Sequence, residues 1–202
     1  MTTYILTCFN ESEHAGNFML FQKPQPVPVP GGAASLAWFA RPTQPGKSSI
    51  IQWTIDYGFV WSQSSTLQPG TVFQPAQFVP ADPMGINLIQ YGQDEHGVPH
   101  LSDPSANGQR GYLTIQQAVT VTPRRSAVGI AMSGVPVAAV LAEPVMMAPF
   151  VPHPNYWLAF GQYQAGEVLD VETILDAVEV QFLPNQYTRS AFRAKDGRIS
   201  LS

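Results

Sequence analysis

Hydrophobic and polar residues alternate with a period of two along much of the chain, which is typical of β-strands with one buried face. Residues 51–61 show the pattern most clearly. Their odd positions, from Ile51 to Trp61, are bulky and apolar, whereas their even positions are mostly polar or small. We therefore expect one long strand over residues 51–61 whose apolar face lies in the core.

Other segments carry shorter forms of the same pattern. We expect further strands over residues 4–8, 17–22, 35–40, 72–79, 86–91, 111–116, 127–132, 136–142, 156–163 and 178–183. Ser133-Gly134 predicts a tight hairpin turn, and Asp196-Gly197 predicts a C-terminal hairpin over residues 187–202. Residues 171–178 fit a short helix capped by Asp170 as well as they fit a strand.

Prolines and glycines divide the whole chain into short segments. There are 19 prolines and 16 glycines among the 202 residues, and their spread disfavours long helices. No linker or repeat divides the sequence. The predicted fold is therefore a single-domain antiparallel β-sandwich over residues 1–202, with a closed β-barrel as the alternative.

Charge and cysteine content narrow the classes of partner. Only 12% of residues are charged, about half the usual share, and the net charge of −4 argues against nucleic acid as a partner. The apolar runs are too short to span a bilayer, so no membrane partner is expected. A single cysteine, Cys8, and a first segment unlike a signal peptide predict a cytoplasmic protein and leave leaderless export open.

One loop gathers potential metal ligands. Asp94, His96 and His100 lie close together in the sequence and could supply oxygen and nitrogen ligands to a divalent metal. Gly97 and Pro99 disfavour a helix that would align the two imidazoles. A solvated turn between strands explains the same residues more simply, and no cofactor is expected.

Catalytic motifs are absent from the sequence. It contains no Gly-x-Ser-x-Gly elbow, phosphate loop, dinucleotide fingerprint, CxxC pair or HExxH. An enzyme built from scattered polar groups would draw on Asp56, Asp82, His153 and Asp170. If Asp56 were buried among the neighbouring aromatic residues, its carboxyl pKa would rise and it could act as a general acid or base.

Aromatic side chains are the other candidates for a site. The candidate ligand-binding residues are Trp38, Tyr57, Trp61, Tyr156 and Trp157, because aromatic rings stack on sugars and line small-molecule pockets. The period-two placement of the rings in residues 51–61 favours a core role for most of them.

Several segments together resemble one bacterial family. They are residues 35–39, 45–46, 53–62, 67–70, 80–83, 127–134, 152–161 and 166–171. Over nearly its whole length the sequence resembles the rhizosphere-induced protein RhiA family. The resemblance implies a host-associated or social role under quorum-sensing control, and it implies no reaction and no catalytic residues. The loop over residues 94–103 looks like an insertion between the matching segments.

The sequence leaves more than one function open. The leading hypothesis is a non-catalytic binding or interaction protein that forms a homo-oligomer and takes a small-molecule ligand. The low charge, the many strand edges and the aromatic-rich face favour it. The rival is a cofactor-free cyclase, isomerase or hydrolase acting on a small apolar secondary metabolite. A storage protein is the third class.

Overall fold

The computed structural model describes residues 2–23, 28–152 and 155–202. Within these ranges the regular structure consists of β-strands, and no helix is present. The strands of the first half are β1 (Thr3–Asn10), β2 (Gly16–Phe21), β3 (Ala34–Thr43), β4 (Lys47–Thr54), β5 (Tyr57–Ser62), β6 (Gln77–Ala81), β7 (Leu88–Gln93) and β8 (Pro99–Ser105). Those of the second half are β9 (Leu113–Gln117), β10 (Ala127–Met132), β11 (Val135–Leu141), β12 (Met147–Phe150), β13 (Tyr156–Gly161), β14 (Val168–Leu169), β15 (Val178–Val180), β16 (Thr188–Arg193) and β17 (Ile199–Leu201).

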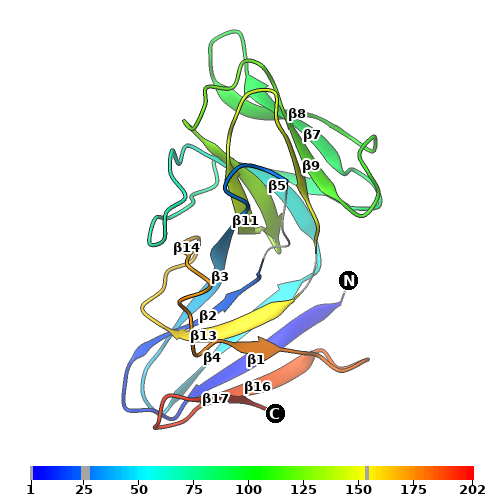
Figure 1. Cartoon of the computed structure of the whole chain (residues 1–202). Coiled ribbons are helices and arrows are strands. Elements are labelled where there is room, and N and C mark those ends of the chain that lie inside the picture. The colour runs from blue at the N-terminus through cyan, green and yellow to red at the C-terminus, as the bar shows by residue number, and fades with distance from the viewer. Residues whose placement is uncertain (1, 24–27, 153–154) are drawn as a thin grey trace.

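The strands form one long sheet and two small ones (Figure 1). The long sheet has nine strands in the order β15-β13-β2-β3-β11-β10-β5-β6, with β14 paired to β3. One four-stranded sheet has the order β17-β16-β1-β4, and the other has the order β12-β9-β7-β8. Pairing is antiparallel except between β1 and β16 and between β7 and β9. The two small sheets lie at opposite ends of the long one, and both chain termini lie beside the β17-β16-β1-β4 sheet.

Each small sheet packs on the long sheet through one continuous hydrophobic cluster. At one end Trp38 of the long sheet packs against Trp53 of β4, with ring centroids 5.6 Å apart. At the other end Trp61 of β5 packs against Tyr91 of β7 at 5.7 Å. All four residues belong to the same cluster of buried side chains. The predicted β-sandwich is therefore confirmed, and because none of the described sheets closes on itself, the alternative of a barrel is wrong.

Loops cover the opposite face of the long sheet. Phe18 and Leu20 of β2 belong to the main cluster, whereas the intervening Met19 belongs to a separate cluster on the other side. Backbone hydrogen bonds fasten the covering loops, with Gly166 donating to the Ala37 carbonyl at 2.7 Å and Phe73 donating to the Gly166 carbonyl at 2.8 Å. Several central strands are consequently buried on both faces, and every residue of β10 is buried.

The single strand expected over residues 51–61 is two strands in different sheets. The chain leaves the small sheet after Thr54 and joins the long sheet at Tyr57. The Ser133 hydroxyl holds this corner, because it accepts from the Thr54 N–H at 2.7 Å and donates to the Thr54 carbonyl at 2.9 Å. The expected face is nevertheless real, since Trp53 and Trp61 point into the same cluster from the two strands.

Three other local predictions have clear outcomes. Ser133 and Gly134 have φ values of 51° and 71° and join β10 to β11 as the predicted tight turn, which is confirmed. The possible helix over residues 171–178 is wrong. Residues 171–177 form turns and irregular structure, in which Thr173 donates its N–H to the Asp170 carbonyl at 3.1 Å and Leu175 is exposed, and Val178 begins β15. The second half of the loop expected over residues 94–103 belongs to a strand, β8.

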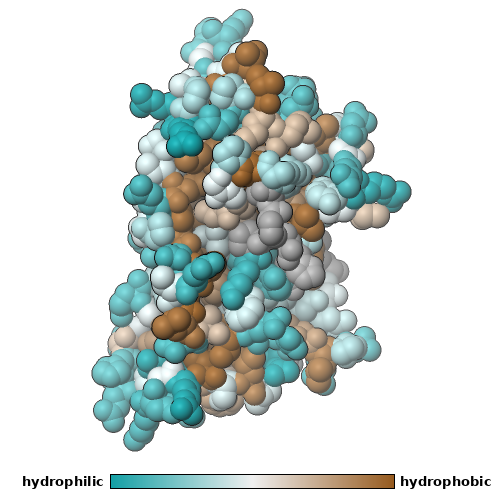
Figure 2. Space-filling model, in the orientation of Figure 1, coloured by the Kyte–Doolittle hydropathy of each residue, from teal (hydrophilic) through white to brown (hydrophobic). Residues whose placement is uncertain are grey.

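The surface is mixed in character. Hydrophobic residues reach the face shown in Figure 2 in several separate places, and hydrophilic residues are prominent at both ends of the molecule. In the described part of the chain, no helix has the length and apolar character needed to cross a membrane.

Candidate functional site

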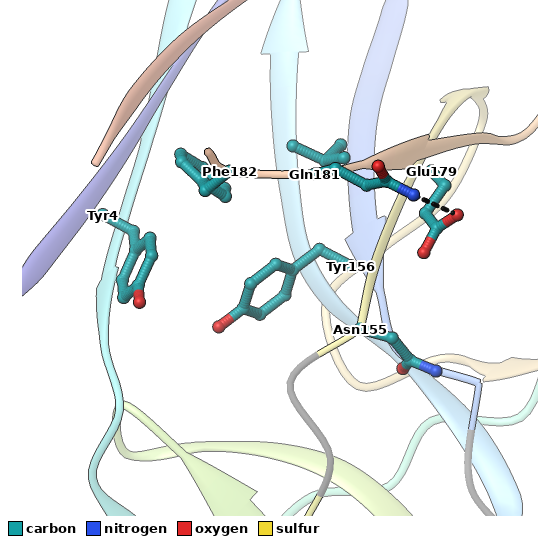
Figure 3. Close-up of a pocket in the computed structure, with 7 residues that line it drawn as sticks. Tyr4, Asn155, Tyr156, Glu179, Gln181 and Phe182 are labelled. Atoms are coloured by element: carbon teal, nitrogen blue, oxygen red, sulfur yellow. Dashed lines mark hydrogen bonds between the residues drawn. The ribbon is translucent and has the colours of Figure 1, made fainter. Parts of the chain in front are cut away.

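An aromatic hollow lies where β13 begins, beside the edge strand β15 (Figure 3). Its volume is about 370 Å³, which falls within the range of small-molecule sites. It is lined by Tyr4, Asn155, Tyr156, Glu179, Val180, Gln181 and Phe182. These residues come from β1, β13, β15 and the segment that follows β15, with Asn155 directly before β13, so the hollow joins the small sheet to the edge of the long sheet.

Strand register sets the positions of the lining side chains. Tyr156 is opposite Val180 in the β13–β15 pair, and both are buried on the inner side of the sheet. Tyr4 reaches the same place from β1, with its ring centroid 4.9 Å from that of Phe182 and 6.1 Å from that of Tyr156. In Figure 3 the hydroxyls of Tyr4 and Tyr156 point to the same side. The three rings form an aromatic wall along one side of the hollow.

Two tryptophans support this wall from behind. Trp53 stacks on Tyr4, with the ring planes 12° apart and the centroids separated by 5.7 Å. Trp38 stacks on Tyr156 at 6.0 Å and donates its indole N–H to the Met132 carbonyl at 2.8 Å. Both indoles are fully buried, so they restrict the rotamers of the lining rings.

Several buried polar atoms at the hollow have no hydrogen-bond partner within the described chain. They are the Tyr156 hydroxyl, the Asn155 Oδ1 and, behind the wall, the Trp53 Nε1. The Trp157 Nε1, on the opposite face of β13 from Tyr156, is a fourth. An unpaired buried polar group costs roughly 1–3 kcal/mol. The hollow therefore holds donors and acceptors whose hydrogen-bonding capacity is not used within the fold.

The buried phenols near the hollow remain neutral around pH 7. Burial raises the pKa of Tyr156, Trp53 partly offsets that rise, and Tyr4 and Tyr57 add to it. The Tyr156 hydroxyl and the Trp53 Nε1 are nonetheless not aligned as a hydrogen bond. Burial, reinforced by Tyr4, also raises the pKa of Tyr57 to about 12. A neutral phenol both donates and accepts a hydrogen bond, so these groups suit a ligand with hydroxyl or amide groups.

Polar side chains line the other side of the hollow. The Gln181 Nε2 donates to the Glu179 Oε2 at 3.0 Å, and Figure 3 shows this pair facing away from the Tyr156 ring. Of the described residues in the lining, Glu179 alone is charged. On the far face of β13, Trp157 pairs across the strands with Glu179. The Lys23 Nζ lies 3.5 Å from the centroid of the Trp157 ring.

The structure distributes the aromatic candidates over three places. Tyr156 lines the hollow, Trp38 supports it and Tyr57 is close enough to influence its phenols. Trp61 lies at the other end of the long sheet, where its indole donates to the Gln77 Oε1 at 3.1 Å. Trp157 lies on the opposite face of the sheet.

Of the seven described lining residues, only Tyr156 was among the predicted ligand-binding residues, and the other six were missed. Tyr4 was recognised only as a strand residue. The alternation over residues 178–183 marked Gln181 and Phe182 only as strand residues, because their place in the hollow depends on the pairing of β15 with β13.

The predicted catalytic residues have local structural roles where they are described. Asp56 is half-buried at the corner between β4 and β5, and its Oδ1 accepts a hydrogen bond from the Thr54 hydroxyl. The Asp82 Oδ1 accepts from the Met84 N–H at 2.9 Å, and the Asp170 carbonyl accepts from the Thr173 hydroxyl at 2.9 Å. His153 lies outside the described residues.

The predicted metal ligands do not form a site. The Asp94 Oδ1 accepts from the N–H groups of His96 and Val98, at 2.9 and 2.8 Å, and so closes the turn between β7 and β8. His96 is exposed beside Glu95, and the His100 Nδ1 lies 3.2 Å from the Val98 carbonyl. No group of three potential metal ligands occurs in the described part of the chain. In the structure the residues of this loop form a turn after β7 and the first part of β8.

Comparisons with known proteins give one consistent match. The family model described as RhiA matches residues 1–202. The sequence is also 34% identical, over 185 residues, to Protein RhiA of Rhizobium leguminosarum bv. viciae, covering 90% of this chain and 78% of that protein. No solved structure matches the chain.

Proposed function

The chain belongs to the RhiA family, and we propose that it is a non-catalytic binding protein whose aromatic hollow takes a small, neutral, polyhydroxylated molecule such as a saccharide unit. One observation carries the proposal. The hollow combines an aromatic wall with buried polar atoms that have no partner among the described residues, at Tyr156 and Asn155.

A saccharide matches both features of the hollow. The C–H face of a sugar ring packs on aromatic rings such as those of Tyr4 and Phe182. Its hydroxyls donate and accept, so they can pair with the amide groups of Asn155 and Gln181 and with a neutral phenol. A purely apolar ligand would leave those polar groups unpaired, at a cost of roughly 1–3 kcal/mol for each buried one.

The charge of the lining favours a neutral ligand. Among the described residues that line the hollow, Glu179 is the only charged one and already accepts a hydrogen bond from Gln181, so an anion would meet repulsion from its carboxylate. Ligand hydroxyls can donate to the remaining lone pairs of the same carboxylate.

The test is a titration of the full chain with a panel of monosaccharides and disaccharides, read by tryptophan fluorescence and by calorimetry. Trp38 and Trp53 stack on the wall, so we expect occupancy of the hollow to change the emission. Gln181→Ala should weaken binding of the best saccharide by up to about tenfold, which corresponds to the loss of one hydrogen bond. Gln90→Ala, which changes another exposed glutamine, on β7, should leave the affinity unchanged. If no saccharide binds, or if the two variants weaken binding equally, the proposal is wrong.

A further inference from the structure

The three sheets end in six edge strands, and these differ in how they are protected. The edges are β15 and β6 of the long sheet, β17 and β4 of one small sheet, and β12 and β8 of the other. An unprotected edge offers a row of free N–H and C=O groups to any other strand, and native proteins block such edges by shortness, proline or cover.

Five of the six edges are blocked. β15 and β17 have three residues each, and β12 has four residues that include Pro149. β6 contains Pro80. The Gln77 side chain of β6 also occupies the space between the facing edges of β6 and β8. The Gln77 Nε2 donates to the Leu101 carbonyl at 3.1 Å, and its Oε1 accepts from the Leu101 N–H at 2.8 Å. The Gln77 amide thus makes the two bonds that a neighbouring strand would make.

The edge strand β4 has none of these protections over residues 47–53, and only at its last residue, Thr54, does the Ser133 side chain pair with its open side. The strand is eight residues long, contains no proline and has a single charged residue, Lys47, at its start. β1 occupies one side of it along the whole length. Its sequence places Ser48, Ile50 and Gln52 on the solvent side, and Ile50 is 58% exposed.

The hydrogen-bond pattern shows which groups of β4 are free to pair. At the end of the strand the Thr54 N–H points away from β1, because it donates to the Ser133 hydroxyl. In an antiparallel pair this direction alternates with every residue. The N–H and C=O groups of Ser48, Ile50 and Gln52 therefore also point away from β1, toward the open side of the strand.

We propose that β4 pairs antiparallel with β4 of a second copy of this chain, about a two-fold axis at Ile50. Opposite residues in an antiparallel pair project from the same face of the sheet. A symmetric register must therefore place residues of the solvent face of one β4 opposite residues of the solvent face of the other. With Ile50 opposite Ile50 of the partner subunit, Ser48 faces Gln52 and about six backbone hydrogen bonds form. The two exposed isoleucines then cover each other.

The same register avoids repulsion between charges. Lys47 is opposite Trp53 and not another lysine, so the only charges within the strand lie at the two ends of the interface. Pairing joins the β17-β16-β1-β4 sheets of the two copies into one continuous eight-stranded sheet with the β17 strands, three residues each, at its edges. Because the contact is isologous, it closes at two copies and does not propagate into a fibre.

Cross-linking tests the register directly. In a hydrogen-bonded antiparallel pair the opposite Cα atoms are about 5.5 Å apart, which is within the range of a disulfide. Ile50→Cys should therefore form a covalent dimer under mild oxidation, whereas Val119→Cys, at a more exposed position away from β4, should not. The one native cysteine, Cys8, is buried and should not compete. If the two variants cross-link to the same extent, or neither does, the proposed pairing is wrong.

The association of the unmodified protein gives the second test. Sedimentation velocity of the full chain from micromolar to millimolar concentration should show a monomer–dimer equilibrium. Ile50→Lys should shift that equilibrium to monomer, because it places like charges opposite each other on the axis. Val119→Lys should leave it unchanged. Circular dichroism should show the same strand content in all forms. A chain that stays monomeric throughout, or a dimer that survives Ile50→Lys, would overturn the proposal.

Discussion

At the scale of single residues, two buried tryptophans perform the same packing role with different hydrogen bonding. Trp38 and Trp53 lie in contact in the main cluster, and both are almost fully buried. The Trp38 indole donates to the Met132 carbonyl, whereas the Trp53 indole has no partner among the described residues. The structure thus contains a matched pair that separates packing from hydrogen bonding.

This pair makes a specific prediction. Trp38→Phe leaves the Met132 carbonyl without its donor, whereas Trp53→Phe removes a donor that is already unpaired. Both changes remove the same atoms from the core, so Trp38→Phe should lower the free energy of unfolding by about 1–3 kcal/mol more than Trp53→Phe does. Urea unfolding of the two variants beside the unchanged protein measures the difference. Equal losses would mean that the Trp38 hydrogen bond contributes nothing to stability.

At the scale of elements, side-chain hydrogen bonds link strands of different sheets where no backbone hydrogen bonds do. Ser133 holds the corner at which the chain passes from the small sheet to the long one. Gln77 joins β6 to β8 across the gap between two sheets and also accepts from the Trp61 indole. Each sheet boundary therefore depends on one polar side chain that imitates a strand partner.

Removing one of these side chains should loosen a defined part of the molecule. Gln77→Ala leaves the N–H and C=O of Leu101 and the Trp61 indole without partners. We expect a loss of about 2 kcal/mol in the free energy of unfolding and faster hydrogen exchange at the Leu101 amide. Hydrogen exchange followed by NMR checks this, with Gln90→Ala on the neighbouring strand β7 as the control. Unchanged exchange at Leu101 would show that the link contributes nothing to the stability of that edge.

At the scale of the whole molecule, one hydrophobic cluster runs beneath both small sheets. It includes Trp53 at one end and Tyr91 at the other, and the β-strands of the long sheet pass continuously between them. A shared core makes separate unfolding of the two ends costly, because unfolding one end would expose hydrophobic side chains of the end that stays folded.

We therefore expect the chain to unfold in one cooperative transition, as the single-domain prediction over residues 1–202 requires. Trp53 reports on one end and Trp61 on the other. In variants that keep only one of these two tryptophans, the fluorescence midpoints in urea should coincide with each other and with the midpoint from circular dichroism, after correction for the stability lost in each variant. Two separate midpoints would divide the molecule into two units.

The sequence by itself determined the class of fold and many of its strands. Period-two alternation and scattered turn residues predict a β-sandwich, and residues 127–132 and the Ser133-Gly134 turn were placed correctly. It also determined which side chains of residues 51–61 enter the main cluster, although Val60, on the other face of β5, is buried as well. These features depend on local geometry, because alternation and turn conformation are properties of neighbouring residues.

The tertiary structure alone decided which strands lie side by side, and with that the site. The break near Asp56 depends on Ser133, which is distant in the sequence, so alternation could not reveal it. The hollow exists because β1, β13 and β15 meet, and the open edge of β4 exists because no described strand pairs with its other side. Contacts between residues far apart in the chain leave no periodic signal in the sequence, because each partner satisfies its own local pattern whichever strand lies beside it.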